Sequence, residues 1–168
     1  SHVYKSSNIP INENFSKIPI SYYGKTKWLA EKYVKKKLKN YCIGRIFSTS
    51  NKNQRKNYLI PDLKEKIKRS KKKIILKNLN HYRDFVSMED IAKVINLLLK
   101  QRFKGTVNIC SGRGIYLKDI AKIILKKYKD KNYEFIDNNI QTSLIGNNKK
   151  LKKMINFEIY KSIERLIF

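Results

Sequence analysis

The chain has 168 residues, of which 41% are hydrophobic, so it can bury the core of one ordinary domain. Its 39 Lys and Arg residues outnumber 13 Asp and Glu residues, which gives a formal net charge of +26. It has no apolar run of about 18 residues, and its only two cysteines form no C-x-x-C pair. These features argue against a membrane span, a disulfide framework and a zinc site, and they predict a reducing compartment, the cytoplasm.

In the first half of the chain, turn residues and apolar spacing predict a loop at 5–20, a helix at 22–39, a buried strand at 41–47, a polar loop at 48–57, a helix from Pro61 to Ser70 and a strand at 74–76. Ser21 is the expected N-cap of the first helix. Trp28, Leu29, Tyr33 and Leu38 form its apolar stripe, and Trp28 is expected in the core.

The second half is predicted to contain a helix at 87–102, a strand at 106–110, a helix at 117–129, a weak strand at 133–136 and short helices near 147–154 and 159–167. Ser87 and Asp90 have a spacing close to that of a capping box, which marks the start of the first of these helices. Because helices alternate with strands, the predicted fold class is α/β.

The high positive charge raises the alternative of a basic nucleic-acid-binding domain. The cations are mostly lysine, 32 against 7 arginines, whereas proteins that read bases favour arginine for its bidentate fork. Asn and Ile are also abundant, with 17 and 24 residues, as A/T-rich codons would produce in any protein. Non-specific polyanion binding is expected at low salt, and a specific affinity that falls steeply with salt would support the alternative.

Two Tyr-x-x-x-Lys pairs, Tyr23/Lys27 and Tyr33/Lys37, each place their side chains on one face of a helix. An ammonium beside a phenol favours the phenolate, so such a tyrosine can give or take a proton at a sugar carbonyl or hydroxyl. The spacing alone is weak evidence, because about two such pairs are expected by chance in a chain this rich in Tyr and Lys. Tyr33/Lys37 has no further motif around it and is interpreted as an ordinary solvated pair.

Tyr23/Lys27 lies in a longer pattern, in which Ser1–Tyr4 and Ile9–Glu13 precede the pair and Glu31 follows it. This pattern resembles S-S-x-x-V-Y-G, P-x-x-E and S-x-Y-x-x-S-K-x-x-x-E of the extended short-chain dehydrogenase/reductases that act on nucleotide sugars. Further segments resemble the same family in the same order, namely Gly44–Ser48, Tyr58–Pro61, Asn78–Asp90, Val107–Gly114 and Leu144–Leu151. Within the family the sequence is most similar to the GDP-sugar branch, and there to the GDP-4-keto-6-deoxymannose reductases.

The resemblance implies roles for individual residues. Tyr23 and Lys27 would be catalytic, and both would bind the cofactor together with Ile46. The implied substrate-binding residues are Ser48, Tyr58, Asn78 and Arg83, and no metal is implied. Arg83 would clamp the nucleotide diphosphate through a bidentate contact, although a structural pairing with Asp84 or Asp90 remains open.

The implied fold is the C-terminal part of an NAD(P)-binding Rossmann-like fold plus a small α/β substrate-binding region. Residues 1–50 would belong to the dinucleotide-binding domain and 51–168 mostly to the substrate-binding region, with 74–110 returning to the sheet. The implied activity is NAD- or NADP-dependent reduction of the C4 keto group of a GDP- or dTDP-linked 4-keto-6-deoxy sugar, in a homodimer. A UDP-hexose 4-epimerase and a nucleotide-sugar dehydratase are the alternatives; dehydratases carry an acid where this chain has His2.

The family's Gly-rich turn, which holds the cofactor pyrophosphate at a helix N-terminus, does not occur in the sequence. We therefore expect the chain to be the C-terminal part of a longer enzyme, preceded by roughly 100 residues that form several βα units. The resemblance places the catalytic Ser/Thr just before Ser1. The chain alone is expected to be inactive and to bind neither NAD nor NADP; micromolar binding in isothermal titration would contradict this.

Overall fold

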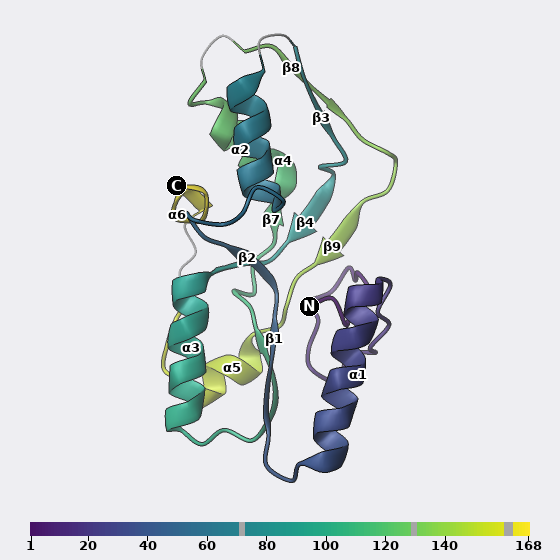
Figure 1. The fold of residues 1–168 in the computed structure, drawn as a ribbon, viewed down its shortest axis with the longest axis vertical. Coiled ribbons are helices and arrows are strands. Elements are labelled where there is room, and N and C mark those ends of the chain that lie inside the picture. The colour runs from purple at the N-terminus through teal and green to yellow at the C-terminus, as the bar shows by residue number, and fades with distance from the viewer. Residues whose placement is uncertain (71–72, 129–130, 160–162) are drawn as a thin grey trace.

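The computed structural model describes the chain except residues 71–72, 129–130 and 160–162, and its helices and short strands follow one another along an elongated molecule (Figure 1). The helices are α1 (Tyr22–Lys37), α2 (Leu59–Arg69), α3 (Met88–Lys100), α4 (Leu117–Leu125), α5 (Lys149–Met154) and α6 (Ile163–Ile167). The strands are β1 (Cys42–Ile46), β2 (Ser48–Ser50), β3 (Ile74–Lys77), β4 (His81–Arg83), β5 (Phe85–Ser87), β6 (Gly105–Ile109), β7 (Ile115–Tyr116), β8 (Tyr133–Ile136) and β9 (Thr142–Leu144).

Parallel strand pairs organise the half of the molecule that contains the N-terminus. β1 pairs in parallel with β6, and β2, which follows β1 directly, pairs in parallel with β5. The chain passes from β5 to β6 through α3, and α1 and α3 lie on opposite sides of β1 (Figure 1). Parallel strands joined through helices confirm the α/β class. The division of the chain near residue 50 stays a prediction.

The other half surrounds a larger hydrophobic cluster. β3 pairs in parallel with β8, while β4 lies between β7, which is antiparallel to it, and β9, which is parallel. Side chains from α2, α4 and α6, including Ile67, Ile124 and Leu166, pack against these strands. A small separate cluster joins Val3 and Tyr4 to Phe47 and Cys110. This small cluster holds the N-terminal segment against the end of β1.

The longer predicted elements occur where the sequence places them. The Oγ of Ser87 accepts a hydrogen bond of 3.0 Å from the backbone N–H of Asp90 and so caps α3. α2 begins slightly earlier than predicted and keeps Pro61 in its first turn, where a missing N–H costs little. α4 ends before the predicted residue 129. The predicted helices at 117–129 and 159–167 reach residues 129–130 and 160–162, which lie outside the described part of the chain.

The apolar stripe predicted for the first helix does not form a buried face, and this prediction is wrong. Leu29, Tyr33 and Leu38 are 59%, 64% and 52% exposed, and Trp28 is only half-buried against the small N-terminal cluster. The buried residues of α1 are instead Gly24 and Glu31. α1 is therefore attached through a close backbone approach and an ion pair more than through hydrophobic packing.

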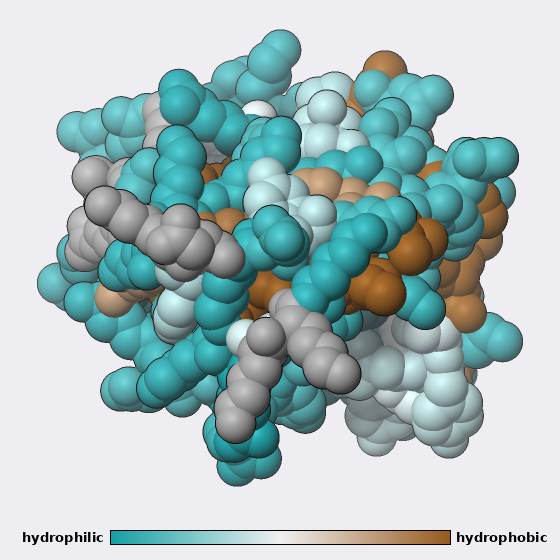
Figure 2. All heavy atoms as spheres, turned by 90° about the horizontal axis from the view of Figure 1, so that it is seen from above, coloured by the Kyte–Doolittle hydropathy of each residue, from teal (hydrophilic) through white to brown (hydrophobic). Residues whose placement is uncertain are grey.

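Figure 2 shows hydrophilic side chains over most of one face, interrupted by a few hydrophobic groups. The hydrophobic groups on this face do not form a single stripe. Among the described residues, no helix combines the length and the apolar character that crossing a bilayer requires.

Candidate active site

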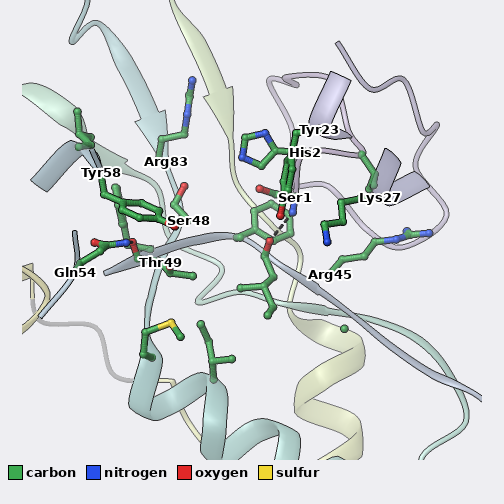
Figure 3. Close-up of a pocket in the computed structure, with 18 of the residues that line it drawn as sticks. Ser1, His2, Tyr23, Lys27, Arg45, Ser48, Thr49, Gln54, Tyr58 and Arg83 are labelled. Carbon is green, nitrogen blue, oxygen red and sulfur yellow. Dashed lines mark hydrogen bonds between the residues drawn. The ribbon is translucent and has the colours of Figure 1, made fainter. Parts of the chain in front are cut away.

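A cavity of about 900 Å³ lies between α1, β1 and the segment that leads into α2. Its volume is within the range of small-molecule sites. Tyr23, His2 and Lys27 lie on one side of it, Thr49, Gln54 and Tyr58 lie on the other, and Arg83 projects from β4 (Figure 3). Segments from four separate parts of the chain therefore meet at one site.

Tyr23 and Lys27 lie on the face of α1 that lines this cavity. Ser21 caps the helix, because its Oγ accepts a hydrogen bond of 3.0 Å from the backbone N–H of Gly24. The Lys27 Nζ lies 5.4 Å from the centroid of the Tyr23 ring, and the Tyr23 side chain is 55% exposed. The phenol and the ammonium are thus close together and open to the cavity, an arrangement suited to proton transfer.

Gly24 brings the N-terminal segment onto the first turn of α1. A Cβ atom at this position would lie 2.2 Å from the carbonyl oxygen of His2, so only glycine fits. The His2 ring meets the Tyr23 ring edge-on, with centroids 5.3 Å apart and an interplanar angle of 88°. Burial, the largest cause, and Arg83 lower the pKa of His2. An uncharged imidazole therefore lies beside the tyrosine, where the family's dehydratases carry an acid.

A buried ion pair joins α1 to β1. The Arg45 Nε donates to the Glu31 Oε2 at 2.9 Å, the Arg45 Nη2 donates to Oε1, and both residues are about 5% exposed. Burial alone would raise the pKa of Glu31, but hydrogen bonds from Arg45 and Lys35 lower it overall. Arg45 also donates to the hydroxyl of Tyr4 and, at 2.8 Å, to the carbonyl of Glu13. Because Glu31 follows Lys27 by one helical turn, this network orients the face that carries Tyr23 and Lys27.

Arg83 does not form the pair with Asp84 that the sequence left open. Its Nη1 donates to the carbonyl oxygens of Tyr82 at 2.7 Å and Thr142 at 3.2 Å, and its Nη2 donates to the Thr142 Oγ1 at 2.9 Å. Burial lowers the pKa of the Arg83 guanidinium, which nevertheless stays charged at neutral pH.

The fully buried Asp84 ties three loops together. Its carboxylate accepts hydrogen bonds from Ser111 Oγ at 2.6 Å and from the backbone N–H groups of Ser111, Gly112 and Gly146 at 2.8, 2.9 and 3.1 Å. Burial raises the pKa of Asp84, and these hydrogen bonds oppose that rise. The aspartate beside Arg83 is therefore structural and fixes the end of β4.

Most of the residues that the sequence assigns to the site lie together. Ile46, Ser48, Tyr58 and Arg83 line the same cavity as the pair on α1. Asn78 is not among the residues that line it; Asn78 is exposed, occupies a turn with φ 57°, and donates its backbone N–H to Ile136. Its role in substrate binding stays a prediction.

The residues that line the cavity and that sequence reasoning did not assign to the site include Thr49, Gln54 and Met88. Thr49 and Gln54 lie in the segment read only as a polar loop, and the Gln54 Nε2 donates to the Thr49 carbonyl at 3.3 Å. One signal could have indicated Thr49 and Gln54. Ser48 and Tyr58, both assigned to the site, flank this segment at its two ends.

The side chains present fit the nicotinamide-ribose end of NAD or NADP. A phenol, an ammonium and the apolar Ile46 line the same cavity. The pyrophosphate would need the Gly-rich turn that the sequence lacks. In the described part of the chain, no three or more His, Cys, Asp or Glu residues are grouped so that they could hold a metal ion.

One family of known proteins matches this chain over nearly its whole length. The sequence model of the GDP-mannose 4,6 dehydratase family matches residues 1–167. GDP-6-deoxy-D-talose 4-dehydrogenase of Aggregatibacter actinomycetemcomitans is 27% identical over 117 residues, which are 68% of this chain and 40% of that protein. The chain thus spans less than half the length of this relative.

Two solved structures share the fold and contain a nicotinamide cofactor. RMD of Pseudomonas aeruginosa, complexed with NADPH, is 16% identical with a TM-score of 0.86, over 99% of this chain and 61% of that chain. dTDP-glucose 4,6-dehydratase of Bacillus anthracis, in complex with NAD, is 20% identical with a TM-score of 0.82, over 99% of this chain and 56% of that chain. The fold is thus Rossmann-like, and the resemblance seen in the sequence is confirmed. The chain belongs to the GDP-mannose 4,6 dehydratase family, within the extended short-chain dehydrogenase/reductases that act on nucleotide sugars.

Proposed function

We propose that this chain carries the proton-transfer and substrate-binding part of an NAD(P)-dependent reductase acting on the C4 keto group of a GDP- or dTDP-linked 4-keto-6-deoxy sugar. The observation that carries the proposal is the cavity in which Tyr23 and Lys27 face the same space as Arg83. A proton donor for a forming alkoxide and a cation for a diphosphate are the two groups that such a substrate requires.

Each residue has a defined task in this reaction. NAD(P)H, when bound, supplies the hydride to C4 of the sugar. Tyr23 gives its phenolic proton to the oxygen on C4, and Lys27 stabilises the phenolate that remains and holds the nicotinamide ribose. Arg83 binds the diphosphate, and Ser48 and Tyr58 contact the rest of the nucleotide sugar.

Two observations favour reduction over the alternatives in the family. Dehydration needs an acid next to the Val-Tyr segment, and this chain has His2 there, with a lowered pKa and its ring edge against Tyr23. The curated relative is named as a 4-dehydrogenase of a GDP-linked 6-deoxy sugar, which is redox chemistry at the same carbon. A UDP-hexose 4-epimerase and a nucleotide-sugar dehydratase remain the alternatives.

The test uses the natural protein that contains this chain, with NADPH or NADH and GDP- or dTDP-4-keto-6-deoxy sugars. A reductase consumes one reduced cofactor for each sugar reduced. The same protein is also given a UDP-hexose and a GDP-hexose with oxidised cofactor: inversion at C4 of the UDP-hexose without net consumption of cofactor would identify an epimerase, and loss of water from the GDP-hexose would identify a dehydratase. Either result would overturn the proposal.

Arg83→Ala is expected to raise KM for the nucleotide sugar far more than it lowers kcat. The diphosphate is remote from C4, so its binding energy is nearly equal in the ground state and the transition state. Loss of a charge-assisted bidentate contact should weaken binding by about 1.5–3 kcal/mol, roughly ten- to a hundredfold. Arg83→Lys should recover only part of this, because an ammonium lacks the fork.

The matched control is Arg113→Ala, which removes the same charge from an exposed position outside the cavity. Its KM should stay at the wild-type value. If Arg83→Ala lowers the melting temperature but leaves KM unchanged, Arg83 has a structural role only and does not belong to the substrate site.

We also propose a homodimer in the cytoplasm, on the family resemblance alone. Sedimentation of the natural protein tests the oligomeric state. Beyond the positive charge, the described residues provide no observation that favours the nucleic-acid-binding alternative.

A further inference from the structure

The pairing of β4 with β9 places three polar side chains next to one another. His81 and Arg83 are two residues apart on β4, so their side chains project from the same face of the strand. Thr142 is the residue of β9 directly opposite His81 in the parallel register. The Thr142 side chain therefore lies between an imidazole and a guanidinium.

Bonds to Thr142 of β9 and to the neighbouring Tyr82 of β4 occupy three N–H groups of the Arg83 guanidinium. The two Nη1–H groups donate to the carbonyls of Tyr82 and Thr142, and one Nη2–H donates to the Thr142 Oγ1. Among the described residues, these bonds leave Nε–H and the second Nη2–H available. These two donors form the side-on fork of arginine, the edge that matches two oxygens of a phosphate.

The hydroxyl of Thr142 is oriented by His81. The backbone N–H of Thr142 donates to the His81 Nδ1 at 3.2 Å, so Nδ1 carries no proton and acts as an acceptor. The Thr142 Oγ1 lies 3.0 Å from the same nitrogen, and with Nδ1 unprotonated a hydrogen bond between them has the hydroxyl as its donor. The lone pairs of the hydroxyl are then free to accept the Nη2–H of Arg83.

We propose that Thr142 is a positioning residue which, with its hydroxyl oriented by neutral His81, holds Arg83 so that its side-on fork faces the diphosphate of the substrate. This inference rests on the proposed function, because it assigns the support of the cation that binds the nucleotide sugar. Neither Thr142 nor His81 lines the cavity, so both act through Arg83.

A proton on His81 would disturb this arrangement. Among the described residues, the charged groups that act on the imidazole are Arg83 on the same strand and Asp137 after β8. The Asp137 carboxylate also pairs with the Nζ of Lys118 of α4 at 2.5 Å. Burial and Arg83 lower the pKa of His81, while Asp137 opposes them. Protonation would turn the acceptor Nδ1 into a donor, and the contacts from the Thr142 N–H and hydroxyl would be lost.

The first test compares KM for the nucleotide sugar in variants of the natural protein. Thr142→Val should raise KM about threefold to tenfold, the loss of one hydrogen bond, with a much smaller effect on kcat. Thr142→Ser restores the hydroxyl and should return KM toward the wild-type value. Gln141→Ala is the control, because Gln141 is an exposed neighbour that donates to Asn80 and has no hydrogen bond to Arg83.

The second test is the pH profile. The wild-type KM should rise as the pH falls below the ordinary histidine value of about 6.5. His81→Asn places an uncharged oxygen where Nδ1 lies, so it should keep the acceptor and remove this rise. A rise that persists in His81→Asn would overturn the role of His81.

The two hypotheses fail separately. If Arg83→Ala raises KM but Thr142→Val does not, the positioning role is refuted and the proposed substrate site stands. If Arg83→Ala also leaves KM unchanged, the substrate site itself is wrong, and the positioning role falls with it.

Discussion

Replacing Tyr23 by phenylalanine should lower kcat about a hundredfold to ten-thousandfold, the usual contribution of a positioned proton donor. KM for the nucleotide sugar should change little, because the phenylalanine ring keeps the packing against His2 and only the hydroxyl is lost. The expected loss is specific to the transition state, in which the oxygen on C4 becomes an alkoxide. Steady-state kinetics of the natural protein measures both constants.

Tyr33→Phe provides a closely matched control. Tyr33 belongs to the second Tyr-x-x-x-Lys pair on the same helix, is 64% exposed, and lies outside the cavity. Loss of the Tyr33 hydroxyl should leave kcat at the wild-type level. Equal effects of the two substitutions, or full activity in Tyr23→Phe, would remove Tyr23 from the catalytic role.

Glu31→Ala should destabilise the fold by about 3–5 kcal/mol, the cost of leaving a buried charge without its partner. Arg45 would lose both of its bonds to Glu31 and would remain 5% exposed within the protein. A domain of this size has about 5–15 kcal/mol of stability in total, so a large fraction would be lost. Chemical denaturation, read as the free energy of unfolding, measures the change.

Lys35→Ala removes the other partner of the same carboxylate. The Lys35 Nζ lies 2.6 Å from the Glu31 Oε1, but the Lys35 side chain is 32% exposed. The substitution should therefore lower the free energy of unfolding by only about 0.3–0.5 kcal/mol. Similar losses in Glu31→Ala and Lys35→Ala would show that the buried contact with Arg45 contributes little.

The difference between wild type and Glu31→Ala should also depend on pH. The folded state lowers the pKa of Glu31, so the unfolded state binds its proton first as the pH falls. The stabilisation is complete above the unfolded value of about 4.3 and is lost as the pH falls through the lower folded value. A difference that grows on acidification would contradict this assignment.

The regular helices could be predicted because each buries one continuous apolar stripe. Ile91, Val94 and Leu98 of α3 recur at helical spacing and are all at most 3% exposed. The same reasoning located α1 correctly but predicted the wrong buried face, because the attachment of α1 depends on Gly24 and on the Glu31–Arg45 pair. Neither of these contacts leaves a periodic signal, since one requires the absence of a side chain and the other joins distant parts of the chain.

The short strands were missed for a related reason. β2, β4, β5, β7 and β9 have only two or three residues each, too few for an alternating pattern. They exist because a partner strand lies alongside them. The register of β4 against β9 brings Thr142 to Arg83, and no local pattern in the sequence contains that register.

The candidate site could be predicted from the sequence more completely than the short strands, because family motifs specify residue types at defined positions. Tyr23, Lys27, Ser48, Tyr58 and Arg83 lie around one cavity, as a common site requires. Asn78 is not among the residues that line this cavity, and its role in substrate binding stays a prediction.

Deuterium transfer tests most directly whether Tyr23 and Lys27 serve a redox reaction at C4. The natural protein is given NADPH deuterated at the transferring position of the nicotinamide, together with a GDP-4-keto-6-deoxy sugar, and the product is read by NMR. We expect deuterium at C4 of the reduced sugar, and the rate of its appearance should collapse in Tyr23→Phe but not in Tyr33→Phe. A product without deuterium at C4, or deuterium transfer that continues at the wild-type rate in Tyr23→Phe, would contradict this function.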